Sequence, residues 1–306
     1  MTPYPALIAR VRAGEPVLID GATGSECLRR GVPDLPNGWS GGAALSDPDI
    51  VRDIHRDYLA LGASIVVANT FATGHNILRD AGVPETFETV NRRAVELVLE
   101  ARAHADAADV VAAAGVSNWS FSEERPDLAT LRDDTARQAA IFADAGAELL
   151  ILEMMVDLPR LTATLDGVAA VDLPVWVGFS LGPEEGCEPD GIGDPVELRE
   201  GGTLADAVAI TGRYPAVDAL VIMHSDVRVV ERGVRTLRSL WDGPIGAWGH
   251  ASAIVDGVFT HDGVVTPEEY ASRVPSWRDA GATMIGGCCG IGPDHLRTIV
   301  DSGVLV

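Results

Sequence analysis

The chain has 306 residues, 47% of them hydrophobic, and a formal net charge of −22. This length and hydrophobic content suit one α/β barrel with a large core, so we expect a single domain over residues 1–306. The negative charge would repel nucleic acid and anionic membranes, and no segment has the pattern of a membrane span or signal peptide, so we expect a cytoplasmic protein with neither partner.

Short apolar runs alternate with amphipathic helical stretches along the whole chain, which predicts strands that are buried on both faces. This alternation requires a parallel sheet with right-handed crossovers, and eight units favour a closed (β/α)8 TIM barrel over an open sheet. The predicted strands are 17–21, 65–71, 110–116, 149–155, 175–181, 219–224, 244–248 and 283–288. The predicted helices are 49–61, 88–106, 131–145, 159–170, 204–213, 228–240, 267–279 and 293–300.

Polar and glycine-rich residues follow the predicted strands at their carboxyl ends. Barrel enzymes carry their active sites at this rim, where the loops after all the strands meet. We therefore expect the site there, with the long irregular segments 27–44 and 182–202 as loops over it. The candidates are Asp20, Asn69, Thr70, Asn118, Glu153, His224, Trp248 and His250, together with Cys288 and Cys289.

The adjacent cysteines of the GGCCG motif at 286–290 are the most informative residues of the chain. Neighbours on a regular strand point to opposite faces, so Cys288 and Cys289 share one metal only if the backbone leaves β geometry, which flanking glycines permit. Zinc suits two thiolates, a third protein ligand and an open position for substrate. A buried cysteine pair or a vicinal disulfide is the alternative. Cys27 and Cys187 belong to no motif, and we expect no function for them.

Several further motifs lie along the chain: LIDGATG at 18–24, ANTF at 68–71, NRRA at 91–94 and ILE at 151–153. With GGCCG at 286–290 and PDHL at 293–296, they resemble the homocysteine S-methyltransferase family nearly end to end. That family consists of zinc-dependent barrels that use betaine, S-methylmethionine or methyltetrahydrofolate as methyl donor. The resemblance therefore implies an S-methyltransferase with zinc as its cofactor.

The resemblance also implies a third zinc ligand at the end of the sixth strand, where family members have a cysteine after an asparagine. Here Met223 and His224 occupy those positions, so we predict a Cys₂His site of His224, Cys288 and Cys289. The alternative is that His224 caps the strand and the metal site is degraded. A second departure lies at 248–250, where the family's aromatic-Pro-Asn run is replaced by Trp-Gly-His, which makes His250 an alternative ligand.

The implied reaction transfers a methyl group from a small sulfonium or quaternary ammonium donor to a thiol, with homocysteine as the expected acceptor and methionine as the product. By resemblance, Asp20 and Glu153 hold the ammonium group of the amino acid; the alternative is that they cap the following helices. Further substrate contacts are expected from Asn69, Thr70, Asn118, Trp248 and His250. Trp39, Trp119 and Trp248 are candidates for an aromatic wall around a cationic donor, or pack under loops instead.

Three other functions stay open on the sequence alone: methylation of a different thiol, a zinc hydrolase, and a metal-free barrel that binds a small molecule. The expected partners are a small-molecule thiol and a methyl donor. A homo-oligomer is compatible with the sequence, which leaves the oligomeric state undetermined.

Overall fold

The computed structural model describes residues 2–122, 124–182, 196–251, 253–255, 258–260 and 265–305. The parallel strands are β1 (Val17–Leu18), β2 (Ile65–Ala68), β3 (Val111–Ser117), β4 (Leu149–Met155), β5 (Val175–Phe179), β6 (Val217–Asp226), β7 (Ile245–His250) and β10 (Met284–Ile285). A separate antiparallel hairpin joins β8 (Ala253–Val255) to β9 (Val258–Thr260). Cys187 and most of the second long loop lie outside the described residues.

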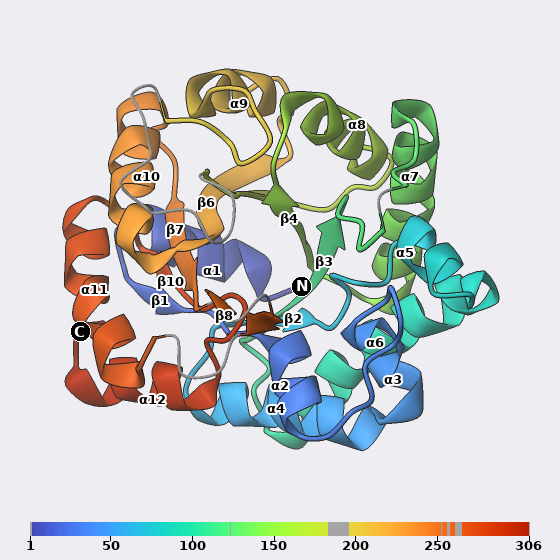
Figure 1. Cartoon of the computed structure of the whole chain (residues 1–306). Coiled ribbons are helices and arrows are strands. Elements are labelled where there is room, and N and C mark those ends of the chain that lie inside the picture. The colour runs from blue at the N-terminus through green and yellow to red at the C-terminus, as the bar shows by residue number, and fades with distance from the viewer. Residues whose placement is uncertain are drawn as a thin grey trace.

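Apart from α1, the helices surround the strands as an outer ring (Figure 1). The long ones are α4 (Pro48–Ala60), α6 (Phe87–His104), α7 (Leu128–Ala145), α8 (Leu158–Val168), α10 (Val227–Leu240), α11 (Pro267–Asp279) and α12 (Pro293–Ser302). The shorter ones are α1 (Tyr4–Arg12), α2 (Thr23–Arg29), α3 (Ala43–Ser46), α5 (His75–Asp80) and α9 (Leu204–Thr211), with 3-10 turns at Ser40–Gly42 and Pro84–Thr86.

The eight parallel strands are hydrogen-bonded in the order β1-β10-β7-β6-β5-β4-β3-β2. A parallel bridge between Ile19 and Ile65 connects the two ends of this order and closes the ring. The predicted (β/α)8 barrel is therefore confirmed. Residues of β3 and β5 are buried throughout, which explains why these strands are apolar runs without alternation.

Two predicted strands are much shorter than expected. β1 and β10 have two residues each, because the chain leaves the strand ladder as it reaches the rim. There the amide of Gly287 donates to the carbonyl of Asp20, and the amide of Cys288 donates to that of Gly249. The predicted ranges 17–21 and 283–288 thus combine a short strand with a rim loop.

Helix α1 closes the barrel at the end opposite the rim and was not expected from the sequence. Its buried residues Tyr4, Leu7, Ile8 and Val11 belong to the same apolar cluster as the side chains inside the barrel, and α1 lies at the centre of the helix ring in Figure 1. The Tyr4 hydroxyl donates to Asp218 (2.8 Å). The rim is therefore the end that offers access to the barrel interior.

The helices begin and end at residues that the sequence marks. Asp226 begins α10 and its carboxylate accepts from the amide of Arg228, while Thr266 accepts from the amide of Glu269 at the start of α11. Gly146 ends α7 in the left-handed conformation (φ 99°). None of the helices in the described part of the chain has the length and apolar content to cross a membrane.

Helix α4 carries a buried histidine with a consequence for stability. His55 is fully buried, and neither ring nitrogen has a hydrogen-bond partner among the described residues. Burial lowers the pKa of His55 from 6.5 to about 3. The unfolded chain thus binds a proton at this residue at a higher pH than the folded chain, and protonation favours unfolding as the pH falls from 6.5 towards 3.

We predict that His55→Leu stabilises the protein and weakens its acid sensitivity. Below pH 6.5 the advantage of the variant in free energy of unfolding is expected to grow by up to about 1.4 kcal/mol per pH unit, because the titrating group is gone. Urea unfolding of both proteins at pH 7, 6 and 5 measures this difference. Parallel stability curves would contradict it, since all other groups titrate alike in the two proteins.

Candidate metal centre and active site

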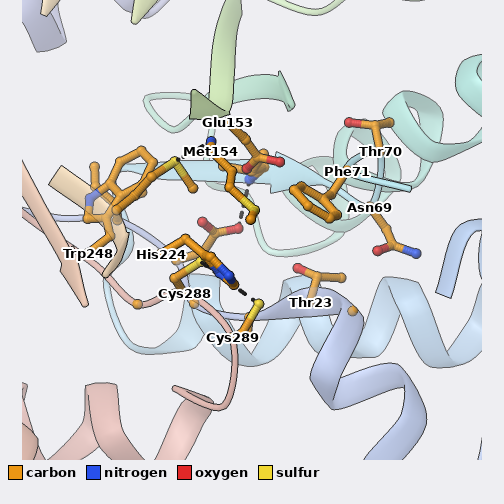
Figure 2. A pocket seen from close by; sticks show the side chains of 18 of the residues that line it. Thr23, Asn69, Thr70, Phe71, Glu153, Met154, His224, Trp248, Cys288 and Cys289 are labelled. Atoms are coloured by element: carbon orange, nitrogen blue, oxygen red, sulfur yellow. Dashed lines mark hydrogen bonds between the residues drawn. The ribbon is translucent and has the colours of Figure 1, made fainter. Parts of the chain in front are cut away.

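Three potential metal ligands meet at the rim of the barrel. His224 lies near the end of β6, and Cys288 and Cys289 follow β10. One donor atom from each residue lies within 4.8 Å of the others. The Cys288 sulfur is 3.6 Å from His224 Nδ1 and 4.0 Å from the Cys289 sulfur. Figure 2 shows the three side chains converging on one point.

These separations suit a tetrahedral zinc ion. Ordinary zinc–sulfur and zinc–nitrogen bond lengths place two ligand atoms about 3.6 Å apart for a sulfur–nitrogen pair and about 3.8 Å apart for a sulfur–sulfur pair. The observed distances of 3.6 Å and 4.0 Å are close to both values. Within the described ranges, no second group of three such side chains is this compact. The donor set therefore fits zinc with one position open.

The cysteine pair faces one point because the backbone turns after β10. The amide of Ile291 donates to the carbonyl of Cys288, and the amide of Ala251 donates to that of Cys289. Gly290 has a φ of 78°, a conformation that a larger residue adopts only with strain. The backbone thus leaves β geometry at the motif, which is the condition under which both cysteines can face one metal.

His224 reaches the same point through an irregularity in β6. The pairing between β6 and β7 shifts register between Met223 and Asp226, and His224 lies inside this bulge with a φ of 44°. A bulge redirects a side chain that would otherwise follow the strand alternation. β4 has a similar shift next to Glu153, where Met154 has a φ of 58°. In both strands, an irregular backbone conformation thus sets the direction of the side chains at the rim.

The electrostatics of the site favour thiolate at Cys288. The side-chain hydrogen bond between Cys288 and Cys289 and the nearby His224 ring hold the pKa of Cys288 well below its usual value, although burial acts in the opposite direction. Two carboxyl groups line the same pocket. Burial raises the pKa of Asp20 well above its usual value, even though its carboxylate accepts from the amide of Val67. Burial also raises the pKa of Glu153, with smaller contributions from Cys288 and Asp20.

Neither acid caps a helix, which was the alternative for both. Helix α8, which follows Glu153, is capped by the side chain of Asp157. Helix α2, which follows Asp20, begins after Ala22 without a side-chain cap. Glu153 instead packs against Gly115, where a Cβ would lie only 2.5 Å from a carboxylate oxygen.

The structure places most of the predicted site residues in one pocket. Trp248 and Phe71 lie on opposite sides of it in the view of Figure 2, with the three sulfur and nitrogen ligands between them. The predicted residues that line the pocket are Asp20, Asn69, Thr70, Glu153, His224, Trp248, Cys288 and Cys289. His250 is not among the lining residues, but its ring lies edge-on to His224 with centroids 4.7 Å apart.

Three polar residues that were predicted to contact substrate use their side chains in hydrogen bonds within the protein. Asn118 does not line the pocket, and its amide donates to Met155 and to Thr164 of α8. The Thr70 hydroxyl donates to the carbonyl of Gly115 (2.8 Å). The Asn69 amide donates to the carbonyl of Ser40 (3.0 Å). These contacts shape the rim loops and leave fewer groups for substrate.

The aromatic wall differs in composition from the predicted one. Trp39 and Phe71 line the pocket, and Phe121 completes a group of three rings whose centroids are 6.0 to 6.4 Å apart. Trp119 stacks with Arg125 instead. Phe71 ends the ANTF motif and could have been selected from the sequence for that reason, whereas Phe121 lies in a loop without a pattern.

Comparison with known proteins gives one consistent result. A sequence profile described as homocysteine S-methyltransferase matches residues 17–302. The chain is 27% identical to a selenocysteine methyltransferase of Astragalus bisulcatus, with 94% of this chain and 92% of the relative covered. It is 25% identical to the homocysteine S-methyltransferase of Escherichia coli K12, with 92% and 94% covered.

The fold agrees with a solved structure, the metallated form of the homocysteine methyltransferase MmuM from E. coli. The TM-score is 0.78 at 22% identity, over 98% of this chain and 100% of the other. The profile match extends from β1 to the last helix and includes both the cysteine pair and His224. The chain belongs to the homocysteine S-methyltransferase family, a family of enzymes that methylate a thiol such as homocysteine, as its motifs predicted.

Proposed function

We propose that this protein transfers a methyl group from a small sulfonium or quaternary ammonium donor to homocysteine, giving methionine, with zinc held by His224, Cys288 and Cys289. The observation that carries the proposal is the compact group of these three side chains at the rim, in a pocket that the carboxyl groups of Asp20 and Glu153 also line. Zinc, when bound, would keep the acceptor sulfur deprotonated at neutral pH and hold it in place.

Asp20 and Glu153 supply a binding site for the ammonium group of an amino-acid acceptor. Both carboxyl groups line the pocket that also contains the cysteine pair. Burial raises their pKa values, so each gains from a cation that replaces lost solvation. An acceptor that carries a thiol and an ammonium group on one short chain matches this arrangement. The carboxyl groups thus orient the acceptor and take no proton from it.

The aromatic group of Trp39, Phe71 and Phe121 supplies a surface for the methyl donor. Aromatic faces attract sulfonium and quaternary ammonium cations, which cannot form hydrogen bonds through their alkyl groups. Two of these rings line the pocket. A donor held here and an acceptor held at the cysteine pair would place the methyl group between them.

The reaction needs no protein nucleophile or base. The thiol proton leaves to solvent when the acceptor binds, and a lone pair of its sulfur then forms the new bond to the methyl carbon. The donor's bond to that carbon breaks, and the electron pair returns to the donor, which becomes neutral at its sulfur or nitrogen. The protein contributes by alignment of the two partners and by exclusion of water.

The first experiment measures zinc and turnover on the same samples. We predict one zinc per chain in the wild type and loss of both zinc and homocysteine methylation from S-methylmethionine in His224→Ala, Cys288→Ser and Cys289→Ser. Cys27→Ala is the matched control, because this cysteine is fully buried outside the ligand group, and it should retain both.

Other outcomes of this experiment are informative. Zinc binding without homocysteine turnover would support the proposed metal site and contradict homocysteine as the acceptor. Selenols and other thiols would then be tested. A cobalt-substituted protein whose spectrum does not respond to thiols would favour a hydrolase instead. Absence of zinc after growth with added zinc would overturn the proposed mechanism.

A second prediction concerns the acceptor site. Glu153→Gln removes the charge and keeps the size, so the KM for homocysteine should rise by about 10- to 100-fold, as expected for loss of a charge-assisted contact. Zinc content and the KM for the donor should not change. Asp218→Asn is the control, because this strand carboxylate lies at the opposite end of β6 and pairs with α1. An unchanged KM for homocysteine would exclude Glu153 from the acceptor site.

A third prediction concerns the donor site. Phe71→Leu removes an aromatic face, so the KM for a cationic donor should rise by about 2- to 30-fold, the range of a cation–π contact. Phe71→Tyr keeps the face and should retain most of the affinity. Steady-state kinetics with varied S-methylmethionine at saturating homocysteine measures the effect. Equal changes in both variants would point to packing instead of cation recognition.

A further inference from the structure

The candidate ligand His224 has a backbone conformation that needs support from its surroundings. Its φ of 44° lies in the left-handed region, which residues with a Cβ rarely adopt. The register shift of β6 at this point also removes regular ladder bonds that would fix the backbone. The orientation of the His224 ring therefore depends on contacts outside the strand.

Two side chains converge on the carbonyl oxygen of His224. The Ser180 hydroxyl donates to it at 2.6 Å, and the Arg199 guanidinium donates to it at 2.9 Å. The two residues are also joined to each other, because the amide of Arg199 donates to the carbonyl of Ser180 (3.0 Å). A carbonyl oxygen has two lone pairs, and this pair of donors can occupy both.

The next residue along β6 is held from the same side. The Ser225 hydroxyl donates to the carbonyl of Met223 (2.9 Å) and accepts from the amide of Leu181 (2.9 Å). The peptide units on both sides of His224 are thus fixed by groups from the segment after β5 and from Ser225 itself. Ser180 and Ser225 are fully buried, so solvent cannot replace these contacts easily.

We propose that Ser180 and Arg199 are positioning residues that hold His224 in its metal-binding orientation and thereby set the metal affinity of the centre. This inference rests on the proposed function in that it takes His224 as a metal ligand. Neither side chain contacts the donor atoms in the described structure; both act through the backbone carbonyl of the ligand. Arg199 has the larger effect, because a charged donor makes the stronger hydrogen bond.

The arrangement also connects the candidate metal centre to residues 196–203, which precede α9. Arg199 lies in this segment, where the amide of Leu198 donates to the carbonyl of Gly202 (2.9 Å) and Leu198 pairs with Leu181. The orientation proposed for His224 would thus depend on Arg199, which these residues hold in place.

The test is a metal-affinity measurement on purified protein, independent of turnover. Zinc and cobalt dissociation constants are measured by chelator competition for the wild type, Arg199→Ala, Arg199→Lys and Ser180→Ala. Arg238→Ala is the matched control, because its guanidinium also donates to backbone carbonyls, those of Trp241, Gly243 and Gly281, away from the site. Thermal unfolding of the metal-free proteins checks that each variant folds.

We expect Arg199→Ala to weaken metal binding by about 10- to 100-fold and to change the visible spectrum of bound cobalt, as loss of an outer partner of a ligand does. Arg199→Lys should recover most of the affinity, and Ser180→Ala should weaken binding in the same direction. The Arg238→Ala control should stay within about 3-fold of the wild type. A general loss of stability would not alter the cobalt spectrum or be rescued by lysine.

Two outcomes overturn the inference, and they are distinguishable from failure of the proposed function. Wild-type affinity and an unchanged cobalt spectrum in Arg199→Ala and Ser180→Ala would overturn the positioning role alone. Equal weakening in Arg238→Ala would do the same. A folded wild-type chain that binds neither metal would overturn the proposed zinc centre itself. If Arg199→Ala fails to fold, Ser180→Ala decides, because it removes only one hydroxyl.

Discussion

The candidate centre depends on one constraint: three side chains must meet at a point that regular strands cannot reach. Adjacent cysteines on a strand would diverge, and His224 on an unbroken β6 would follow the alternation of its neighbours. The chain meets this constraint by a turn after β10 and a bulge in β6, both at the rim. The short ladder of β10 and the left-handed φ of His224 are the departures from regular strand geometry that accompany this convergence.

The donor set has a further electrostatic consequence for the pocket. A zinc ion with two thiolates and a neutral imidazole has a net charge of zero, whereas three thiolates would give −1. The family resemblance places a cysteine where this chain has His224, so this chain would have one negative charge less beside Asp20 and Glu153. Burial already raises the pKa of both carboxyl groups, and the nearby Cys288 and Asp20 raise the pKa of Glu153 further. A histidine ligand at this position would therefore make it easier for both carboxyl groups of the pocket to be ionised.

The fold was predictable because its signal is repeated: strands buried on both faces are apolar runs, and polar residues follow them at the rim. The cysteine pair could be selected because adjacent cysteines between glycines suit a metal, and His224 because the family resemblance implies a ligand at the end of the sixth strand. Other features had no such signal. Arg199 acts on a carbonyl from a loop, and Asn118 follows β3 at the rim, yet its amide contacts α8 instead of the pocket. The positive φ of Met154 depends on tertiary packing, which no local pattern encodes. Helix α1 did have a local signal, because its buried residues Tyr4, Leu7, Ile8 and Val11 follow helical spacing, but its place at the end of the barrel depends on tertiary packing.

The ring of strands is unevenly joined, and the ligands span the uneven part. β1 pairs with β10 through two residue pairs and meets β2 through a single bridge, whereas β6 pairs with each neighbour through five. The seam formed by β1 and β10 therefore has the shortest ladders of paired residues among the described parallel strands, since β10 also pairs with β7 through only two residue pairs. Cys288 and Cys289 follow β10 beside that seam, and His224 belongs to the longest strand. An ion bound by all three residues would link the part of the wall with the shortest ladders to its longest strand. Metal binding at the candidate centre would then also stabilise the closed barrel.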